Sequence, residues 1–253
     1  MESGAPPEKR IVIVEDDDSV ARLLEDSLQR NGFAVPAVFR SGEDALQGMP
    51  RINPDLVLMD IVLEGHLDGI ETAERILEQF RIPVVYLTAY SDTEVLQRVA
   101  QSAPYGYLVK PCHIHEIVRG IELALARHRM EQALLESEKR YRAIFDHVSD
   151  AIMVSAIVGG TLGPFVDVNE AALRKLGYER GEMLNQSLMD ICDENCADDC
   201  AAMLRRLLED GQAACEVILV GKGERKLLVN VNAHQFLLNG EILVLSICHD
   251  CAL

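Results

Sequence analysis

The chain has 253 residues, 49% of them hydrophobic, and carries a formal net charge of -17. This length accommodates two domains with separate cores, and the hydrophobic content excludes a largely disordered protein. The acidic balance argues against nucleic acid as a direct partner, because phosphate binding needs a basic surface. The first residues lack the apolar segment of a signal peptide, and no apolar run reaches membrane-spanning length. We therefore expect a cytoplasmic protein without a membrane segment.

Four short apolar runs in the N-terminal half each end in polar residues. The first is followed by Glu15 and Asp16, and the others end at Asp60, Thr88 and Lys110. Their Val and Ile content, and the helical patterns after them, are typical of buried parallel strands in an α/β domain. The carboxyl ends of parallel strands lie at one edge of a sheet, so we expect these five residues to converge there.

Helical patterns alternate with these runs. Helices are expected over residues 20–30, 41–49 (with Ser41 as N-cap), 69–79 and 92–102. A further strand over 34–39 contains Pro36, which indicates the edge of a sheet. From His113 the helical pattern continues at least to Phe145, which is too long for a helix that only closes the domain.

The polar residues at the strand ends predict a phosphorylation site. Asp60 is the candidate nucleophile, because a carboxylate can accept a phosphoryl group as an aspartyl phosphate. Glu15 and Asp16 would repel Asp60 unless a cation lay among them, and Mg²⁺ suits carboxylate oxygens and water. Lys110 and Thr88 offer a positive charge and a hydroxyl donor for the phosphoryl oxygens.

With these residues, the segment from Arg10 to Arg127 resembles the receiver domain of bacterial and archaeal response regulators. The resemblance implies a flavodoxin-like, doubly wound, five-stranded parallel sheet in the order 2-1-3-4-5. It implies a partner histidine kinase, and no enzymatic activity beyond the receiver's own phosphotransfer and slow autodephosphorylation. The implied site comprises the phosphoacceptor Asp60, the Mg²⁺ ligands Glu15, Asp16, Asp60 and Val62 (carbonyl), and the phosphate-binding and switch residues Thr88, Tyr107, Lys110 and Pro111. Proline lowers the cost of a cis peptide, so the Lys110–Pro111 bond is a candidate for that form.

From Ala151 the pattern changes to that of an α+β domain with an antiparallel sheet. Its five expected strands cover residues 151–155, 164–168, 213–220, 225–235 and 241–249, and its helices cover 170–176 and 198–209. Asp167 and Asn169 are expected to cap the helix that follows them.

Three segments of this half resemble a PAS domain, and the resemblance extends over about Arg140 to Asp250. They are residues 137–152, 166–178 and 245–250. The helix over 198–209 has no His for a haem, and the cysteine-centred flavin motif is absent, so the residues disfavour both cofactors. The ligand of this domain, if it has one, is not identified by the sequence.

Five cysteines of the second half have suggestive spacing. Cys192, Cys196 and Cys200 are spaced by four, which predicts one helical face, and Cys248 and Cys251 form a C-x-x-C pair. Thiolates at such spacings could hold zinc or an iron–sulfur cluster, or take part in redox chemistry. The alternative is that they are thiols packed in the core, where free cysteines are common.

The domain organisation follows from these segments. We predict a disordered N-terminus over residues 1–9, a receiver over 10–127, a helical linker over 128–147 and a PAS domain over 148–253. The linker has apolar positions that would let it pair with a copy of itself, giving a homodimer through linker and PAS domain. These positions are Met130, Leu134, Tyr141, Ile144 and Phe145.

The leading functional hypothesis is a two-component response regulator, phosphorylated on Asp60, whose helical linker couples the receiver to a PAS sensing or dimerisation module. Two alternatives are a receiver–PAS fragment of a larger hybrid sensor histidine kinase, and a redox or metal sensor that uses the PAS cysteines. A phosphatase is disfavoured, because enzymes of that type carry a second acid two residues after the nucleophile, where this chain has Val62.

Overall fold

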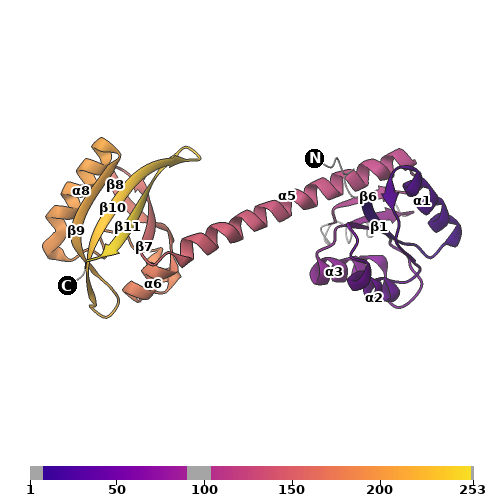
Figure 1. The fold of residues 1–253 in the computed structure, drawn as a ribbon, viewed down its shortest axis with the longest axis horizontal. Coiled ribbons are helices and arrows are strands. Elements are labelled where there is room, and N and C mark those ends of the chain that lie inside the picture. Colours follow the sequence, from indigo (N-terminus) through magenta and orange to yellow (C-terminus); the bar gives the residue numbers. More distant parts are fainter. Residues whose placement is uncertain (1–7, 90–103, 252–253) are drawn as a thin grey trace, which may run out of the picture. The chain divides into compact units, whose positions relative to one another are not determined.

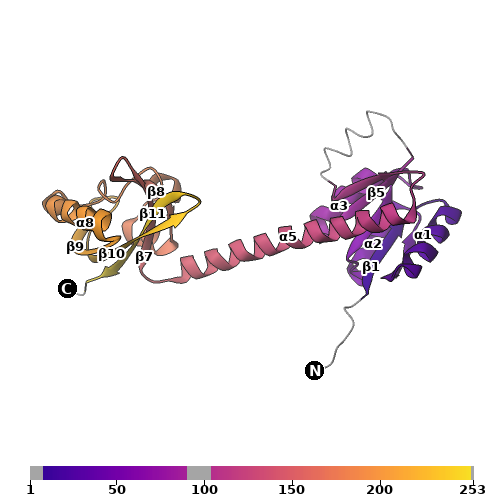
Figure 2. The same ribbon diagram turned by 90° about the horizontal axis from the view of Figure 1, so that it is seen from above.

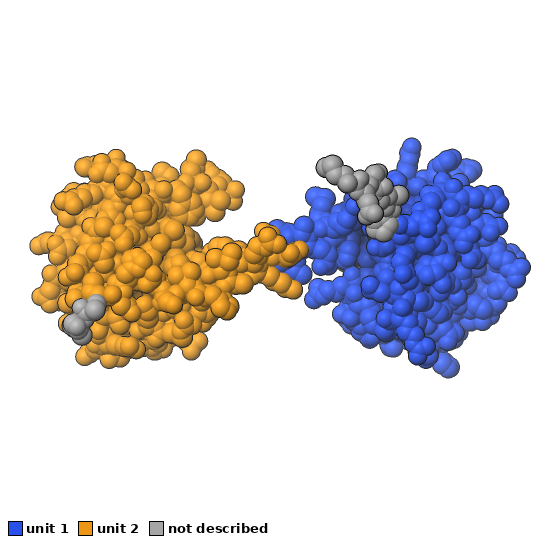
Figure 3. Space-filling view, in the orientation of Figure 1, with its two compact units in different colours: residues 1–135 blue, residues 136–253 orange. Residues whose placement is uncertain are grey.

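A computed structural model describes residues 8–89 and 104–251, which belong to two compact units, Met1–Leu135 and Glu136–Leu253 (Figure 3). The helix expected over residues 92–102 lies outside the described residues. Among the described helices, none combines the length and apolar character that a membrane crossing requires.

The first unit is built on a parallel sheet (Figure 1). Its strands are β1 (Lys9–Val14), β2 (Phe33–Ala34), β3 (Val38–Phe39), β4 (Leu56–Asp60), β5 (Val84–Thr88) and β6 (Gly106–Val109). The order is β2-β1-β4-β5-β6, and β3 also pairs with β1. Since β2 and β3 are two parts of one edge strand interrupted around Pro36, which has no N–H to donate, the predicted order 2-1-3-4-5 is confirmed. Lys9, which the sequence places in the N-terminal segment 1–9, belongs to β1.

Helices cover both faces of this sheet. They are α1 (Asp18–Arg30), α2 (Gly42–Ile52), α3 (Gly69–Phe80) and α5 (Ile114–His147) (Figure 2). Neighbouring strand residues point to opposite faces, so Val12 and Val57 pack in the core under α2 and α3, whereas Ile11 and Leu56 pack in the core under α1 and α5. Ser41 caps α2 by accepting a hydrogen bond from the N–H of Asp44, as predicted. The helix continues three residues past the predicted end at Met49, with Pro50 in its last turn.

A single long helix, α5, belongs to both units. Ile117, Ile121 and Ala124 pack in the core of the first unit. Phe145, near the other end, packs with Ile152 on the outer face of the second sheet. The predicted long joining helix is therefore confirmed, with bounds Ile114–His147.

The second unit has the predicted five-stranded antiparallel sheet, and its strands lie in the order β8-β7-β11-β10-β9. Its strands are β7 (Ala151–Val158), β8 (Thr161–Val168), β9 (Gln212–Val220), β10 (Lys226–Leu238) and β11 (Glu241–Asp250). The predicted helices are α6 (Glu170–Leu176) and α8 (Ala197–Asp210). The short helices α7 (Arg180–Met183) and η1 (Glu194–Cys196) were not predicted, because one turn is too short to show helical periodicity.

The two expected caps of α6 have different roles. Asn169 is the N-cap: its Oδ1 accepts hydrogen bonds from the N–H groups of Ala172 and Ile152, at 2.9 and 3.0 Å. Asp167 was wrongly predicted as a cap. Its carboxylate instead accepts hydrogen bonds from the guanidinium groups of Arg142 and Arg180, at 2.9 and 3.3 Å. The same carboxylate also accepts a hydrogen bond from the N–H of Val168 at 2.9 Å, but the N-cap position of α6 belongs to Asn169, two residues later.

Candidate functional site

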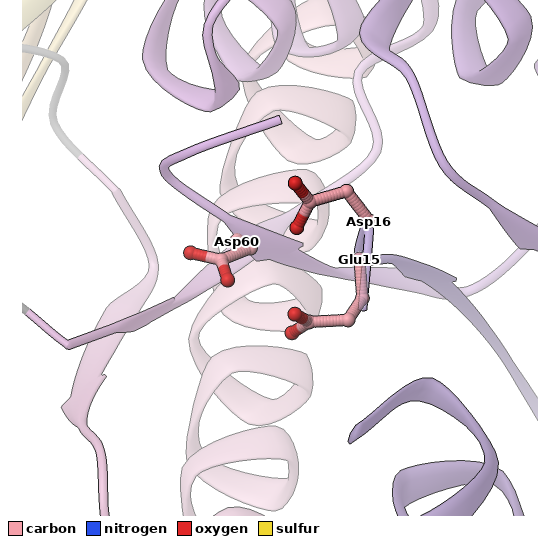
Figure 4. A group of neighbouring side chains, drawn as sticks. All are labelled: Glu15, Asp16 and Asp60. Carbon is pink, nitrogen blue, oxygen red and sulfur yellow. The ribbon is translucent and has the colours of Figure 1, made fainter. Parts of the chain in front are cut away.

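Three carboxylates meet at the carboxyl ends of two neighbouring strands (Figure 4). Glu15 and Asp16 directly follow β1, and Asp60 is the last residue of β4. The strands pair directly, with Val14 opposite Met59, so their ends are adjacent. One carboxylate oxygen from each of the three residues lies within 4.8 Å of the other two. Glu15 is buried, and Asp16 and Asp60 are half-buried.

Lys110 places a positive charge beside this group. It follows β6, and its Nζ donates hydrogen bonds to Oε2 of Glu15 at 2.6 Å and Oδ2 of Asp60 at 2.7 Å. The backbone N–H of Lys110 also donates to the carbonyl of Thr88 at 2.7 Å. The Lys110–Pro111 peptide bond is cis, as predicted. The ammonium compensates part of the repulsion among carboxylates that burial would otherwise make severe.

The protonation properties of Glu15 and Lys110 reflect this environment. Burial raises the pKa of Glu15 to about 6, against the lowering effect of the Lys110 hydrogen bond, and the Asp60 charge raises it further. Burial alone would lower the pKa of Lys110. The hydrogen bonds and charges of Asp60 and Glu15 outweigh that effect and raise its pKa, so Lys110 is a cation at neutral pH.

The remaining residues implied by the receiver resemblance lie around the same strand ends. Thr88 is the last residue of β5 and is fully buried. Tyr107 lies on β6 and is 54% exposed. The backbone N–H of Val62 donates to Oδ1 of Asp60 at 3.3 Å, and its side chain is exposed. The structure thus places Thr88 at the end of β5 and Val62 just after β4, whereas Tyr107 lies within β6, three residues before Lys110.

Two residues that the sequence analysis missed hold the loop after Asp60. Oε1 of Glu43 accepts hydrogen bonds from the N–H groups of His66 and Leu67, at 2.9 and 3.2 Å. Arg40 pairs with Glu64 of the same loop at 3.0 Å and with Asp18 at 2.6 Å. These partners are more than 20 residues apart in sequence, so no local pattern marks Glu43 or Arg40 as an anchor.

The donor set of the acidic group suits a hard divalent cation. Three carboxylates within this distance offer only oxygen ligands, which Mg²⁺ and Ca²⁺ prefer over nitrogen or sulfur. The half-buried positions of Asp16 and Asp60 leave room for water, and Mg²⁺ usually retains several waters. The acidic group therefore fits Mg²⁺.

The cysteines have a different arrangement from the predicted helical face. Only Cys200 lies within α8; Cys196 is its N-cap, and Cys192 forms an isolated β-bridge with Leu219. The thiol of Cys200 is nevertheless near enough to that of Cys192 to raise its pKa. Burial raises the pKa of both thiols, which disfavours the reactive thiolate.

The two cysteines of the C-x-x-C pair lie in different surroundings. Cys248 is buried in the core of the second unit, whereas the thiol of Cys251 lies 3.7 Å from Oε2 of the exposed Glu216. Within residues 8–89 and 104–251, the acidic group is the only set of three or more His, Cys, Asp or Glu whose ligand atoms approach each other within 4.8 Å.

Comparison with known proteins matches both halves of the chain. Residues 11–122 match the family of response regulator receiver domains, and residues 149–251 match a family of PAS domains. Over 137 residues the chain is 32% identical to the transcriptional regulatory protein PdtaR of Mycobacterium tuberculosis (strain CDC 1551 / Oshkosh), which covers 54% of this chain and 66% of PdtaR. Over 125 residues it is 34% identical to the DNA-binding response regulator MtrA of Mycolicibacterium smegmatis, covering 49% of this chain and 54% of MtrA.

A solved structure is similar to the same half. The signal receiver domain of a modulated diguanylate cyclase from Desulfovibrio desulfuricans G20 is 37% identical, with a TM-score of 0.47, and the match covers 49% of this chain and 98% of that one. The match spans 66% of PdtaR and 54% of MtrA, so their names describe longer proteins than the part compared.

Proposed function

Because the chain belongs to the response regulator receiver family and carries a PAS domain after its receiver, we propose that it is a phosphorylation-dependent signalling protein with Asp60 as the phosphoacceptor. The observation that carries the proposal is the position of Asp60, within reach of two other carboxylates and 2.7 Å from an ammonium group. A partner histidine kinase is the proposed phosphoryl donor, and the cytoplasm is the proposed location of this chain. One Asp60 oxygen attacks the phosphorus and forms the aspartyl phosphate, while the bond to the donor's phosphohistidine nitrogen breaks.

The other residues stabilise the negative charge of the transferred group. Lys110, now bound to Asp60 and Glu15, would move its hydrogen bonds to a phosphoryl oxygen. Glu15, Asp16, Asp60 and the carbonyl of Val62 would hold Mg²⁺, which when bound neutralises charge on the phosphoryl oxygens. The pKa of Lys110 is raised, so its positive charge is present throughout the neutral pH range.

Phosphorylation acts as a switch in this proposal through Thr88 and Tyr107. The hydroxyl of Thr88 donates to the new phosphoryl group, and the displacement of Thr88 opens space for the half-exposed ring of Tyr107 to turn inward. Because β6 leads directly into α5, the altered surface includes the start of the helix that continues to His147. The signal would leave the receiver along this helix.

Acetyl phosphate with Mg²⁺ provides a direct test, since it replaces the unknown kinase. We expect intact-mass measurement to show one added phosphoryl group on the wild-type chain and none on Asp60→Asn. The matched control is Asp17→Asn, one residue beyond the acidic pair, whose side chain caps α1 and retains a capping oxygen after the change. Equal labelling of Asp60→Asn and wild type would refute Asp60 as the phosphoacceptor.

The rate of phosphate release distinguishes a phosphorylated switch from a phosphatase. A switch should release phosphate slowly after stoichiometric labelling, so a time course of phosphate release with excess acetyl phosphate should show low, near-constant turnover. Rapid multiple turnover that depends on Asp60 would instead indicate a phosphatase.

A further inference from the structure

A cavity of about 210 Å³ lies at the edge of the first unit's sheet that is opposite the acidic group. Its walls come from the first residue of β1, from the segments that lead into β4 and β5, and from α5. These are the amino ends of the strands, whereas Glu15, Asp60 and Thr88 lie at or just after the carboxyl ends. The cavity is therefore separate from the proposed phosphorylation site.

Positive side chains are concentrated around this cavity. Lys9, Arg81 and Arg129 line it. Asp55 is the one carboxylate among its described lining residues, so three positive charges and one negative charge leave an excess of two. This excess stands out in a chain whose formal net charge is -17. It is matched by a ligand that carries two negative charges.

Asp55 does not cancel this positive charge. Its carboxylate accepts a hydrogen bond from the backbone N–H of Arg10 at 2.8 Å, so part of its capacity is already used by the chain. Its ion pair with Lys9 has a distance of 3.6 Å, and both side chains are more than a third exposed. Exposed pairs of this kind are weak, so the Lys9 ammonium is available to an anion.

The backbone of Arg81 adopts a conformation that side chains disfavour. Arg81 ends α3 with a φ of +55°, in the left-handed region where helices usually place glycine. Asn53, which ends α2, lines the same cavity and has a φ of +46°. Backbone strain of this kind clusters at functional sites. The strain at Arg81 places a guanidinium, which can donate two parallel hydrogen bonds to a phosphate, at the cavity wall.

The wall that α5 contributes is held by a network of side chains. Tyr105, just before β6, donates a hydrogen bond from its hydroxyl to Oε2 of Glu131 at 2.6 Å. The Nδ1 of His128, a lining residue of the cavity, lies 3.1 Å from the same hydroxyl. Arg127 lies over the Tyr105 ring at 5.3 Å. A wall that is fixed in advance reduces the entropy lost when a ligand binds.

The size of the cavity restricts the ligand. Pockets for drug-sized molecules usually have volumes of roughly 300–1,000 Å³, and this cavity is smaller. It can hold a small anion, or the charged group of a larger molecule whose remainder lies outside. Two guanidinium groups and an ammonium favour phosphate oxygens, which accept several charge-assisted hydrogen bonds at once.

We propose that this cavity binds a phosphoryl dianion, either free inorganic phosphate or the phosphate group of a monoester. The bound anion would contact Lys9 of β1, Arg81 at the end of α3 and Arg129 of α5, and would thereby hold α5 against the amino ends of the strands. This inference does not rest on phosphorylation of Asp60, so the unphosphorylated full chain tests it.

Isothermal titration calorimetry with inorganic phosphate and with AMP, at about pH 8 and low ionic strength, measures the binding. Chelator replaces Mg²⁺, so that no metal can draw phosphate to the acidic group. We expect a Kd of about 1 mM or tighter for at least one probe. Arg81→Gly should weaken binding by about tenfold or more, and its melting temperature should not fall, because glycine suits this φ. Arg129→Gln should weaken binding to a similar extent.

The matched control is Arg22→Gln, which removes an exposed positive charge from α1 and should leave the affinity unchanged. Binding should also slow amide hydrogen exchange in α5 around His128 and Arg129. Tighter binding of AMP would identify a monoester as the source of the anion, and equal or tighter binding of inorganic phosphate would identify the free ion. The proposal would be overturned by the absence of binding at about 10 mM of either probe. It would also be overturned if Arg81→Gly or Arg129→Gln left the affinity unchanged, or if the control weakened binding equally.

Discussion

Lys110 Nζ lies 2.7 Å from Asp60 Oδ2, although 50 residues separate them in sequence. The contact exists because β4 and β6 run parallel on either side of β5, so that their carboxyl ends open on the same edge. The same ammonium reaches Glu15 on a third strand end. Lys110 thus links three strand ends, and it is the natural place to test how this edge of the sheet is stabilised.

Replacing Lys110 with Ala should destabilise the metal-free protein. Glu15 and Asp60, with side chains only 3% and 13% exposed, would lose the cation between them. We expect the free energy of unfolding of the first unit at pH 7 to fall by about 1–3 kcal/mol, and Mg²⁺ to restore part of it. Urea unfolding with and without Mg²⁺ measures both effects.

The control for this change is Lys9→Ala. Lys9 forms an ion pair with Asp55 at 3.6 Å in which both side chains are more than a third exposed, so its loss should cost about 0–1 kcal/mol. Equal losses for the two variants would contradict the compensating role of Lys110.

The affinity for Mg²⁺ should depend on pH through Glu15. Its pKa is raised to about 6 by burial, and a carboxylic acid must lose its proton to bind the metal. The affinity should therefore be constant above pH 7 and fall by up to about tenfold for each pH unit below 6. Isothermal titration calorimetry at pH 5, 6, 7 and 8 measures this dependence, and Glu15→Gln should bind more weakly with a flatter profile. A flat wild-type profile from pH 5 to 7 would exclude protonation of Glu15 in that range.

The loop after Asp60 should not tolerate a side chain at position 65. Gly65 has a φ of +112°, and an added Cβ would lie 2.5 Å from Oε2 of Glu43, the residue that anchors the loop. Gly65→Ala should cost about 1–3 kcal/mol and speed amide exchange at His66 and Leu67. Gly159→Ala is the control, since Gly159 also has a positive φ but no atom within 4 Å of the new Cβ. Hydrogen exchange and denaturation should separate the two variants, and identical behaviour would mean that the contact with Glu43 is unimportant.

Asn169 should be a major stabilising residue of the second unit. Its amide is buried, accepts hydrogen bonds from Ile152 and Ala172, and donates to the carbonyls of Phe145 and Asp150 at 3.1 and 2.9 Å. Asn169→Ala leaves these backbone groups without partners, so we expect a loss of about 2–4 kcal/mol.

Thermal or urea unfolding measures this loss, and Asn185→Ala in the same unit is the control. Asn185 is exposed and its amide makes one hydrogen bond, to the carbonyl of Gly181, so its replacement should cost less than about 1 kcal/mol. A similar loss for the two variants would show that burial of the Asn169 amide contributes nothing.

Local sequence patterns predicted the helices and strands because the features that favour each element lie in consecutive residues. Buried strands such as Leu56–Asp60 show continuous apolar runs, and the hairpin strands of the second unit alternate around turns such as Asn239–Gly240. Parallel topology then implied that Glu15, Asp16 and Asp60 would meet, because polar residues at the ends of neighbouring parallel strands share one edge. The one-turn helix Arg180–Met183 was missed because a single turn has no period to detect.

Periodicity and strand order in the amino-acid sequence are enough to predict the two fold classes, the joining helix and the residues at the sheet edge. The hydrogen-bond partners of individual side chains, in contrast, became known from the folded structure. In the folded structure Asp167 binds two arginines and does not cap a helix. Cys248 is buried in the core, whereas Cys251 lies next to Glu216. Glu43 binds the loop after Asp60. The folded structure also buries Phe145 while leaving Met130 and Leu134 exposed. The physical reason is that side-chain partners and burial depend on segments distant in sequence, whose positions are fixed only when the sheets and helices have packed.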